Sequence, residues 1–170
     1  MTDPGSYRIA LVCLGNICRS PTADVVLNAR LAEAGLADVR AESCGTGTWH
    51  LGEEMDGRSA AVLVAAGYDP SRHRARLFDP SWFDHDLILT MDRDNHREVL
   101  ALLPADRHDR VRMFRSFDPE VPPGTPAPDV PDPWYGGPQG FDDVLEIVER
   151  TCDGLVAHLT GPYGPAAARP

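Results

Sequence analysis

The stretch "IALVCLGNICRSPTADVVLNARLAEAG", residues 9–35, contains the clearest structural pattern in the chain. It opens on a continuous apolar run, and we predict a buried strand over residues 7–12. It closes on apolar residues at helical spacing followed by glycine, and we predict a helix over residues 21–34. A strand therefore leads into a helix through one short turn, and Cys13 stands at the start of that turn.

The rest of the chain continues the alternation of strands and helices. We predict further strands over 39–43, 86–90 and 111–113, and further helices over 59–66, 92–102 and 141–159. Residues 118–140 form a long loop rich in proline and glycine, of the length at which loops commonly serve a site. The alternation predicts an α/β sandwich with a parallel sheet, and such sheets bind ligands outside the carboxyl ends of their strands. Cys13 lies at that edge.

Length, charge and hydropathy set the class of protein. A chain of 170 residues with 42% hydrophobic content can fill one core. We expect a single domain over residues 1–160 and a flexible Pro/Ala-rich tail over residues 161–170. The net charge of -10 argues against nucleic acid or an anionic membrane as the main partner. No leader-like segment or membrane-length apolar run is present in the sequence, which favours a cytoplasmic protein.

The residue inventory excludes several kinds of site. All 16 basic residues are arginines, so phosphate loops that need lysine and enzymes that form Schiff bases are excluded. The four cysteines are too scattered for a disulfide-built domain, and they form no CxxC pair. The histidines show no metal-ligand spacing. We therefore expect reduced thiols, no metal and no cofactor.

The turn after the first strand has the chemistry of a phosphate site. Backbone N–H groups at a helix N-terminus lack partners, and Gly15 permits the conformation that points successive N–H groups inward. The planar guanidinium of Arg19 matches two phosphate oxygens. The predicted phosphate-binding residues are Leu14, Gly15, Asn16, Ile17, Cys18 and Arg19.

Cys13 is the candidate nucleophile of this turn. A helix N-terminus and a nearby arginine favour the thiolate form of a cysteine, which would lie beneath the bound phosphorus. Ser20 is placed to donate a hydrogen bond to the sulfur or to cap the helix. A buried structural thiol is the alternative, but the Cys-x5-Arg spacing between a strand and a helix favours the nucleophile.

Two motifs carry a resemblance to a known family. "VCLGNICRSPTAD" resembles the N-terminal signature of the low-molecular-weight protein tyrosine phosphatases, and "DPWYGG", which begins at Asp132, resembles their second motif. The resemblance implies a four-stranded parallel sheet with helices on both faces. It also implies a phosphotyrosine hydrolase in which Cys13 accepts the phosphoryl group and Asp132 is general acid and base, without a metal. An acid on a separate loop agrees with in-line attack by the thiolate.

The resemblance also assigns residues around the turn. Trp49, Trp134 and Tyr135 would flank a slot whose depth selects phosphotyrosine, with core packing as the alternative for Trp134. Ser43 and His73 would join Asn16 in a polar network that supports the phosphate loop, and a solvated histidine is the alternative for His73.

Cys18 is the candidate redox partner of Cys13, because two thiols in one curled loop could form a disulfide after oxidation. Packing beneath the loop is its alternative role.

Two alternative activities have specific signals. Relatives that hydrolyse phosphoarginine carry threonine where Ile17 stands, so the isoleucine favours phosphotyrosine. Thioredoxin-coupled arsenate reductases need a further cysteine pair downstream, and residues 45–151 contain no cysteine. Cys44 and Trp134 depart from residues common in the family, Ala and Tyr, which bears on substrate preference. The expected partners are phosphotyrosine-containing proteins, and the expected state is a monomer or weak dimer.

Overall fold

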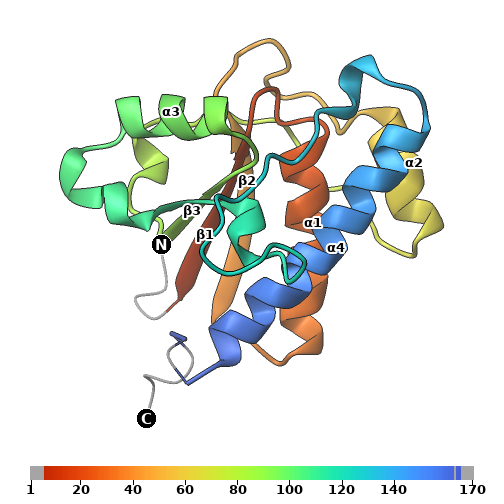
Figure 1. Ribbon diagram of the computed structural model, residues 1–170. Helices are drawn as coiled ribbons and strands as arrows, with labels where there is room; N and C mark the ends of the chain where they lie inside the picture. The colour runs from red at the N-terminus through yellow and green to blue at the C-terminus, as the bar shows by residue number, and fades with distance from the viewer. Residues whose placement is uncertain (1–5, 163, 166–170) are drawn as a thin grey trace.

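The computed structural model describes residues 6–162, 164 and 165 (Figure 1). The strands are β1 (Tyr7–Cys13), β2 (Val39–Gly45), β3 (Leu87–Thr90) and β4 (Val111–Met113). The α-helices are α1 (Arg19–Glu33), α2 (Gly57–Ala65), α3 (Arg93–Leu102) and α4 (Gln139–Thr160). Much of the predicted flexible tail lies outside the described residues, so its flexibility stays a prediction.

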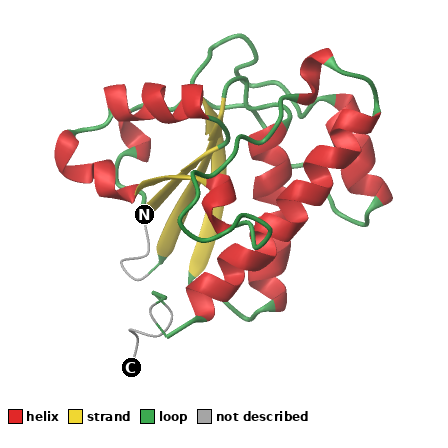
Figure 2. Ribbon diagram, in the orientation of Figure 1, coloured by secondary structure: helices red, strands yellow, loops and turns green. Residues whose placement is uncertain are grey.

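The four strands form one parallel sheet in the order β2-β1-β3-β4. Side chains alternate along β1, so Ile9 and Leu11 enter one buried cluster while Ala10 and Val12 enter another. Residues of α1 and α4 complete the first cluster, and residues of α3 complete the second. Helices therefore cover both faces of the sheet (Figure 2), which confirms the predicted sandwich.

The described residues include four short 3-10 helices that the sequence did not predict. They span Pro80–Trp82, Ala105–Arg110, Phe114–Phe117 and Pro133–Tyr135. Each is too short to show an apolar repeat, which is the signal on which sequence prediction depends. The helix α1 also begins two residues earlier than predicted, at Arg19, so the turn between β1 and α1 is shorter than the sequence indicated.

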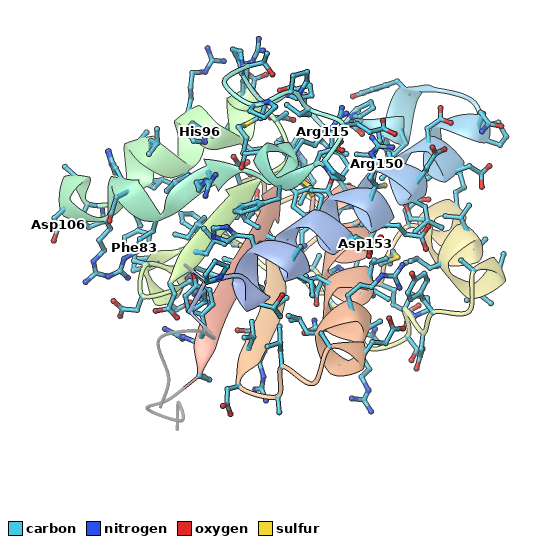
Figure 3. The ribbon with its side chains drawn as sticks, turned by 60° about the horizontal axis from the view of Figure 1, so that its bottom comes forward. Phe83, His96, Asp106, Arg115, Arg150 and Asp153 are labelled. Atoms are coloured by element: carbon cyan, nitrogen blue, oxygen red, sulfur yellow. The ribbon has the colours of Figure 1, made fainter. Side chains whose placement is uncertain are left out.

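The long loop after β4 is held by hydrogen bonds at Asp118, where it begins, and at Asp129 and Val130, about halfway along it. The buried carboxylate of Asp118 accepts two hydrogen bonds from Arg150 of α4, at 2.8 and 3.0 Å, and one from Arg115. The two arginines are labelled in Figure 3. Arg115 also donates to the carbonyl of Asp129, at 3.1 Å. The next amide, of Val130, donates to the carbonyl of Met91 just after β3, at 2.7 Å. The loop is thereby returned to the carboxyl edge of the sheet.

Among the residues that the structure describes, no helix has the length and apolar character needed to cross a membrane.

Candidate active site

The sulfur of Cys13 lies at the carboxyl end of β1, inside the turn that leads to α1. The residue is buried, and Sγ is 3.0 Å from the hydroxyl of Ser20 and accepts a hydrogen bond from the amide of Asn16 at 3.3 Å. The N-cap of α1, Cys18, makes no side-chain capping bond. The positive end of the α1 dipole therefore faces the turn with its amides uncapped by any side chain, as a phosphate loop requires.

Ser20 contacts the sulfur, as predicted, but it does not cap the helix. The helix begins one residue before it, so Ser20 lies within the first turn of α1. Its hydroxyl is held between Cys13, the side-chain amide of Asn16 at 2.9 Å and the carbonyl of Cys44 at 3.3 Å. The hydroxyl is thus fixed beside the thiol.

The prediction that Gly15 takes the unusual backbone conformation of this turn is wrong. Asn16 has the left-handed φ, +55°, and asparagine tolerates this region better than most residues. Gly15 serves close approach instead, because a Cβ there would lie 3.3 Å from the ring of His50. The side chain of Asn16 holds the strained residue by accepting from the amide of Arg76 at 2.8 Å.

His73 joins this network, as predicted. Its Nε2 lies 2.7 Å from the carbonyl oxygen of Asn16, which can only accept, so Nε2 donates. Burial lowers the pKa of His73, although the bond to Asn16 opposes the shift, so the ring that supports the loop is neutral.

Ser43 does not join the network, and this prediction is wrong. Its hydroxyl donates to the carboxylate of Asp24 at 2.9 Å. Alternate side chains of β2 face opposite sides of the sheet, and Ser43 faces α1, where Asp24 lies. Ser43 therefore joins β2 to α1 without touching the phosphate loop.

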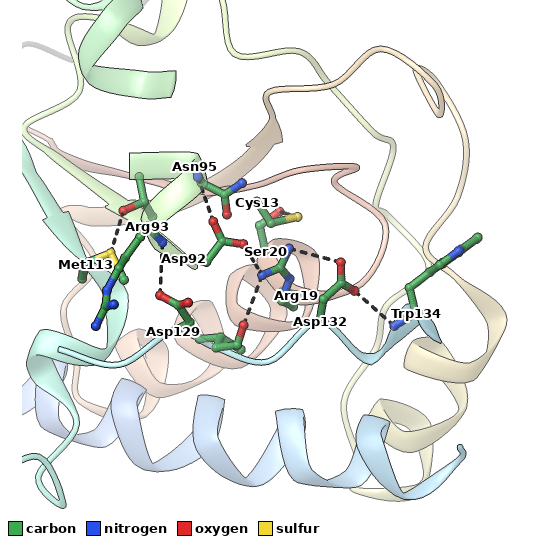
Figure 4. A network of polar contacts seen from close by, with 12 residues as sticks. Cys13, Arg19, Ser20, Asp92, Arg93, Asn95, Met113, Asp129, Asp132 and Trp134 are labelled. Atoms are coloured by element: carbon green, nitrogen blue, oxygen red, sulfur yellow. Dashed lines mark hydrogen bonds and ion pairs between the residues drawn. The ribbon is translucent and has the colours of Figure 1, made fainter. Parts of the chain in front are cut away.

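Arg19 is buried and joins three segments of the chain. Its Nη1 donates to Asp92 at 2.7 Å and to the carbonyl of Val130 at 3.1 Å, and Nη2 lies 3.5 Å from Asp132 (Figure 4). Burial opposes its charge, yet the sulfur of Cys13 and the two carboxylates raise its pKa. The guanidinium is thus fixed in one orientation beside the sulfur.

Asp92 is a functional contact that sequence reasoning missed. It caps α3 by accepting from the amide of Asn95 at 2.7 Å, while its other oxygen orients Arg19. An acidic residue directly after a strand of a parallel sheet was the available signal, because it had to lie at the same edge as Cys13.

The carboxylate of Asp132 is held on the long loop, across the cavity from the sulfur. One oxygen accepts from the amide of Trp134 at 3.1 Å, and the other lies 3.5 Å from Arg19. The side chain is 37% exposed, so one face remains open to the cavity.

A cavity of about 220 Å³ brings together Cys13, Arg19 and Asp132 with the three predicted aromatic residues. Trp49 and Tyr135 are 70% and 91% exposed, and Trp134 is 39% exposed. Trp134 therefore forms a wall, while the other two rings stand at the mouth. His50, which sequence reasoning missed, also lines the cavity, with its ring centroid 5.8 Å from that of Trp134.

The cysteines other than Cys13 are buried and free in the described structure. Burial raises the pKa of the Cys18 thiol to about 12, although a hydrogen bond with Ser59 opposes the shift. Burial likewise raises the pKa of Cys44 and of Cys152. A disulfide between Cys13 and Cys18 stays a prediction.

A family sequence model and individual relatives both match this chain over most of its length. A sequence model of the family described as low molecular weight phosphotyrosine protein phosphatase matches residues 8–162. The chain is 48% identical over 155 residues to a low molecular weight protein-tyrosine-phosphatase of Streptomyces coelicolor, covering 89% of this chain and 93% of that protein. It is 44% identical over 156 residues to low molecular weight protein-tyrosine phosphatase A of Mycobacterium tuberculosis, covering 91% of each.

Solved structures are similar over the same span. The crystal structure of a protein tyrosine phosphatase from Entamoeba histolytica, with Hepes in its active site, has a TM-score of 0.84 and 33% identity, covering 91% of this chain and 97% of that one. The crystal structure of YfkJ from Bacillus subtilis has a TM-score of 0.82 and 28% identity, covering 91% and 94%.

Proposed function

The chain belongs to the low molecular weight phosphotyrosine protein phosphatase family, and we propose that it hydrolyses phosphotyrosine in proteins through Cys13, Arg19 and Asp132. One observation carries the proposal: a buried sulfur at the uncapped N-terminus of α1 shares a cavity with a fixed guanidinium and with a carboxylate from a separate loop. The shared cavity supports the proposal, because a nucleophile, a phosphate-binding cation and a proton donor would all have to face one substrate.

In the first step the Cys13 thiolate attacks phosphorus, and the bond from phosphorus to the tyrosine oxygen breaks. Arg19 and the amides of the phosphate loop bind the equatorial oxygens, where charge is spread in the transition state. Asp132, protonated at this stage, donates its proton to the departing phenolate. The products of the step are the dephosphorylated tyrosine residue of the substrate protein and a thiophosphate on Cys13.

In the second step Asp132 takes a proton from water, and the water oxygen attacks the thiophosphate. The sulfur–phosphorus bond breaks, inorganic phosphate leaves, and the thiolate is restored. The hydroxyl of Ser20, 3.0 Å from the sulfur, is placed to stabilise the thiolate as it leaves.

The shape and lining of the cavity support phosphotyrosine over other phosphorylated residues. Trp134 supplies an aromatic wall against which a phenyl ring can pack. Ile17, 7% exposed, offers the substrate only apolar surface. An aliphatic phosphoserine is too short to exploit the wall, and the guanidinium of phosphoarginine would find no hydroxyl at Ile17.

We expect the protein to work as a cytoplasmic single-domain enzyme, as a monomer or weak dimer. Four free, buried cysteines are compatible with a reducing compartment.

The test is a comparison of kcat/KM for matched peptides carrying phosphotyrosine, phosphoserine or phosphoarginine, with a chelator present. We expect phosphotyrosine to be strongly preferred, and Ile17→Thr to narrow the gap to phosphoarginine. A preference of the unaltered enzyme for phosphoarginine would overturn the assigned substrate.

A further inference from the structure

Arg58, at the start of α2, lies over two aromatic rings that belong to the far end of the chain. Its guanidinium carbon is 5.3 Å from the ring centroid of Trp134 and 4.6 Å from that of Phe141. Trp134 is the wall of the cavity, and Phe141 is a buried residue of the first turn of α4. Arg58 itself is not among the described residues that line the cavity.

Asp56 fixes the orientation of this guanidinium. Nε of Arg58 donates to one carboxylate oxygen at 3.1 Å, and Nη2 donates to the other at 3.0 Å. Burial raises the pKa of Asp56, but the hydrogen bonds from Arg58 outweigh it, and the net shift is downward. The pair is thus a charged, two-point contact, which holds the plane of the guanidinium.

Asp56 is itself joined to the phosphate loop, because its backbone amide donates to the carbonyl of Ile17 at 2.9 Å. Phe141 reaches the same loop by packing in one buried cluster with Ile17 and Cys18. Through Asp56 and Phe141, Arg58 is therefore connected to the loop that carries the nucleophile.

Through the ring of Trp134, Arg58 is also connected to the loop that carries the acid. The backbone amide of Trp134 donates to the carboxylate of Asp132 at 3.1 Å, so the placement of the tryptophan determines the placement of that carboxylate. The contacts run without a break from Ile17 through Asp56, Arg58 and Trp134 to Asp132.

We infer that Arg58 is a positioning residue that holds Asp132 over the leaving group by fixing Trp134 relative to the phosphate loop. The inference rests on the proposed role of Asp132 as general acid. Only arginine satisfies both contacts, because its planar fork binds a carboxylate at two points while its face stacks on an aromatic ring. Lysine would keep the charge, but it could neither bind the carboxylate at two points nor stack a planar group on the aromatic ring.

The experiment compares Arg58→Lys with the matched surface control Arg97→Lys, whose arginine pairs with Asp94 on α3. The assay measures kcat/KM, which reports the steps up to formation of the thiophosphate, for aryl phosphates that span good and poor leaving groups. We expect Arg58→Lys to lower kcat/KM roughly tenfold for phosphotyrosine and less than about twofold for the best leaving group, because in this step only a poor leaving group needs the acid. The control should match the unaltered enzyme on both substrates.

A double variant distinguishes positioning from a general structural effect. If Arg58 acts through Asp132, adding Arg58→Lys to Asp132→Asn should cause no further loss of kcat/KM. Additive losses, or an equal loss on good and poor leaving groups, would overturn the inference while leaving Asp132 as the acid. A flat leaving-group response in Asp132→Asn alone would instead overturn the proposed function of that residue.

Should Arg58→Lys fail to fold, Asp56→Asn carries the same test. It frees the guanidinium from its fork while asparagine retains the cap of α2, and the same outcomes decide the inference.

Discussion

The two oxygens of Asp132 have different partners, the amide of Trp134 and the guanidinium of Arg19, so the carboxyl is held in place before substrate arrives. Asp132→Ala should lower kcat/KM for phosphotyrosine, which reports the step in which the leaving group departs, by about 10²–10⁴, the usual contribution of a positioned general acid. The loss should shrink for an aryl phosphate whose leaving group is a weak base. Steady-state kinetics on the two substrates measure this, and an equal loss on both would reject Asp132 as the acid.

Cys18 lines the same cavity as Cys13, but its thiol is predominantly protonated at neutral pH, with a pKa near 12. We predict that peroxide inactivates the enzyme reversibly through a disulfide between them. The disulfide should form faster as pH rises from about 7 to 9, because the attacking thiolate becomes more abundant.

Peptide mapping after peroxide, and recovery with dithiothreitol, measure the role of Cys18. Cys18→Ser should recover poorly, whereas Cys44→Ser, a second buried thiol, should recover like the unaltered enzyme. Full recovery of Cys18→Ser, with no linked peptide in the unaltered enzyme, would leave Cys18 as a packing residue.

The residue-level errors in the sequence reasoning come from contacts between residues that are far apart in the chain. The sequence placed Gly15 in the strained conformation because glycine usually supplies it, but the hydrogen bonds to Asn16 are made by His73 and Arg76, about sixty residues away. Such distant partners cannot be read from the turn itself. His50 was missed for the same reason, since its contact with Trp134 forms only in the folded chain.

At the scale of elements, α1 and β2 are joined by the carboxyl group of Asp24, whose charged form is disfavoured by burial. Burial raises the pKa of Asp24 to about 6, although the hydroxyl of Ser43 partly offsets the shift. The unfolded chain has the ordinary value of 3.8, so the folded state loses stability as pH rises from about 4 through 6.

Asp24→Asn stays neutral, so its stability relative to the unaltered protein should increase across that interval and level off above about pH 7. Urea unfolding at pH 4.5, 6 and 7.5 measures the difference, with exposed Asp109→Asn as the control. A difference independent of pH would contradict the raised pKa.

Elements with a long apolar repeat were predictable, and short ones were not. The pattern of β1 and α1 is strong because both bury one or more faces along their length. The turn at Pro133–Tyr135 has only three residues and cannot show such a pattern. It is held by one local contact, in which Asp132 caps it. Its relevance to the site was predictable only through the family resemblance.

For the whole molecule, the alternation of strands and helices was sufficient to predict a parallel sheet covered on both faces. The strand order was not predictable from that pattern, since each crossover can add its strand on either side of β1. The order matters for the site, because placing β3 beside β1 brings Asp92 to Arg19.

The most direct test of the proposed mechanism is chemical trapping of the intermediate. The enzyme is mixed with a phosphotyrosine peptide, quenched in acid within milliseconds, and its tryptic peptides are sequenced by mass spectrometry. The proposed mechanism predicts phosphate on Cys13, within the peptide Ile9 to Arg19, in the unaltered enzyme and in Cys18→Ser, and none in Cys13→Ser, which should be inactive. Turnover by Cys13→Ser, or turnover of the unaltered enzyme with phosphate on any other residue, would contradict it.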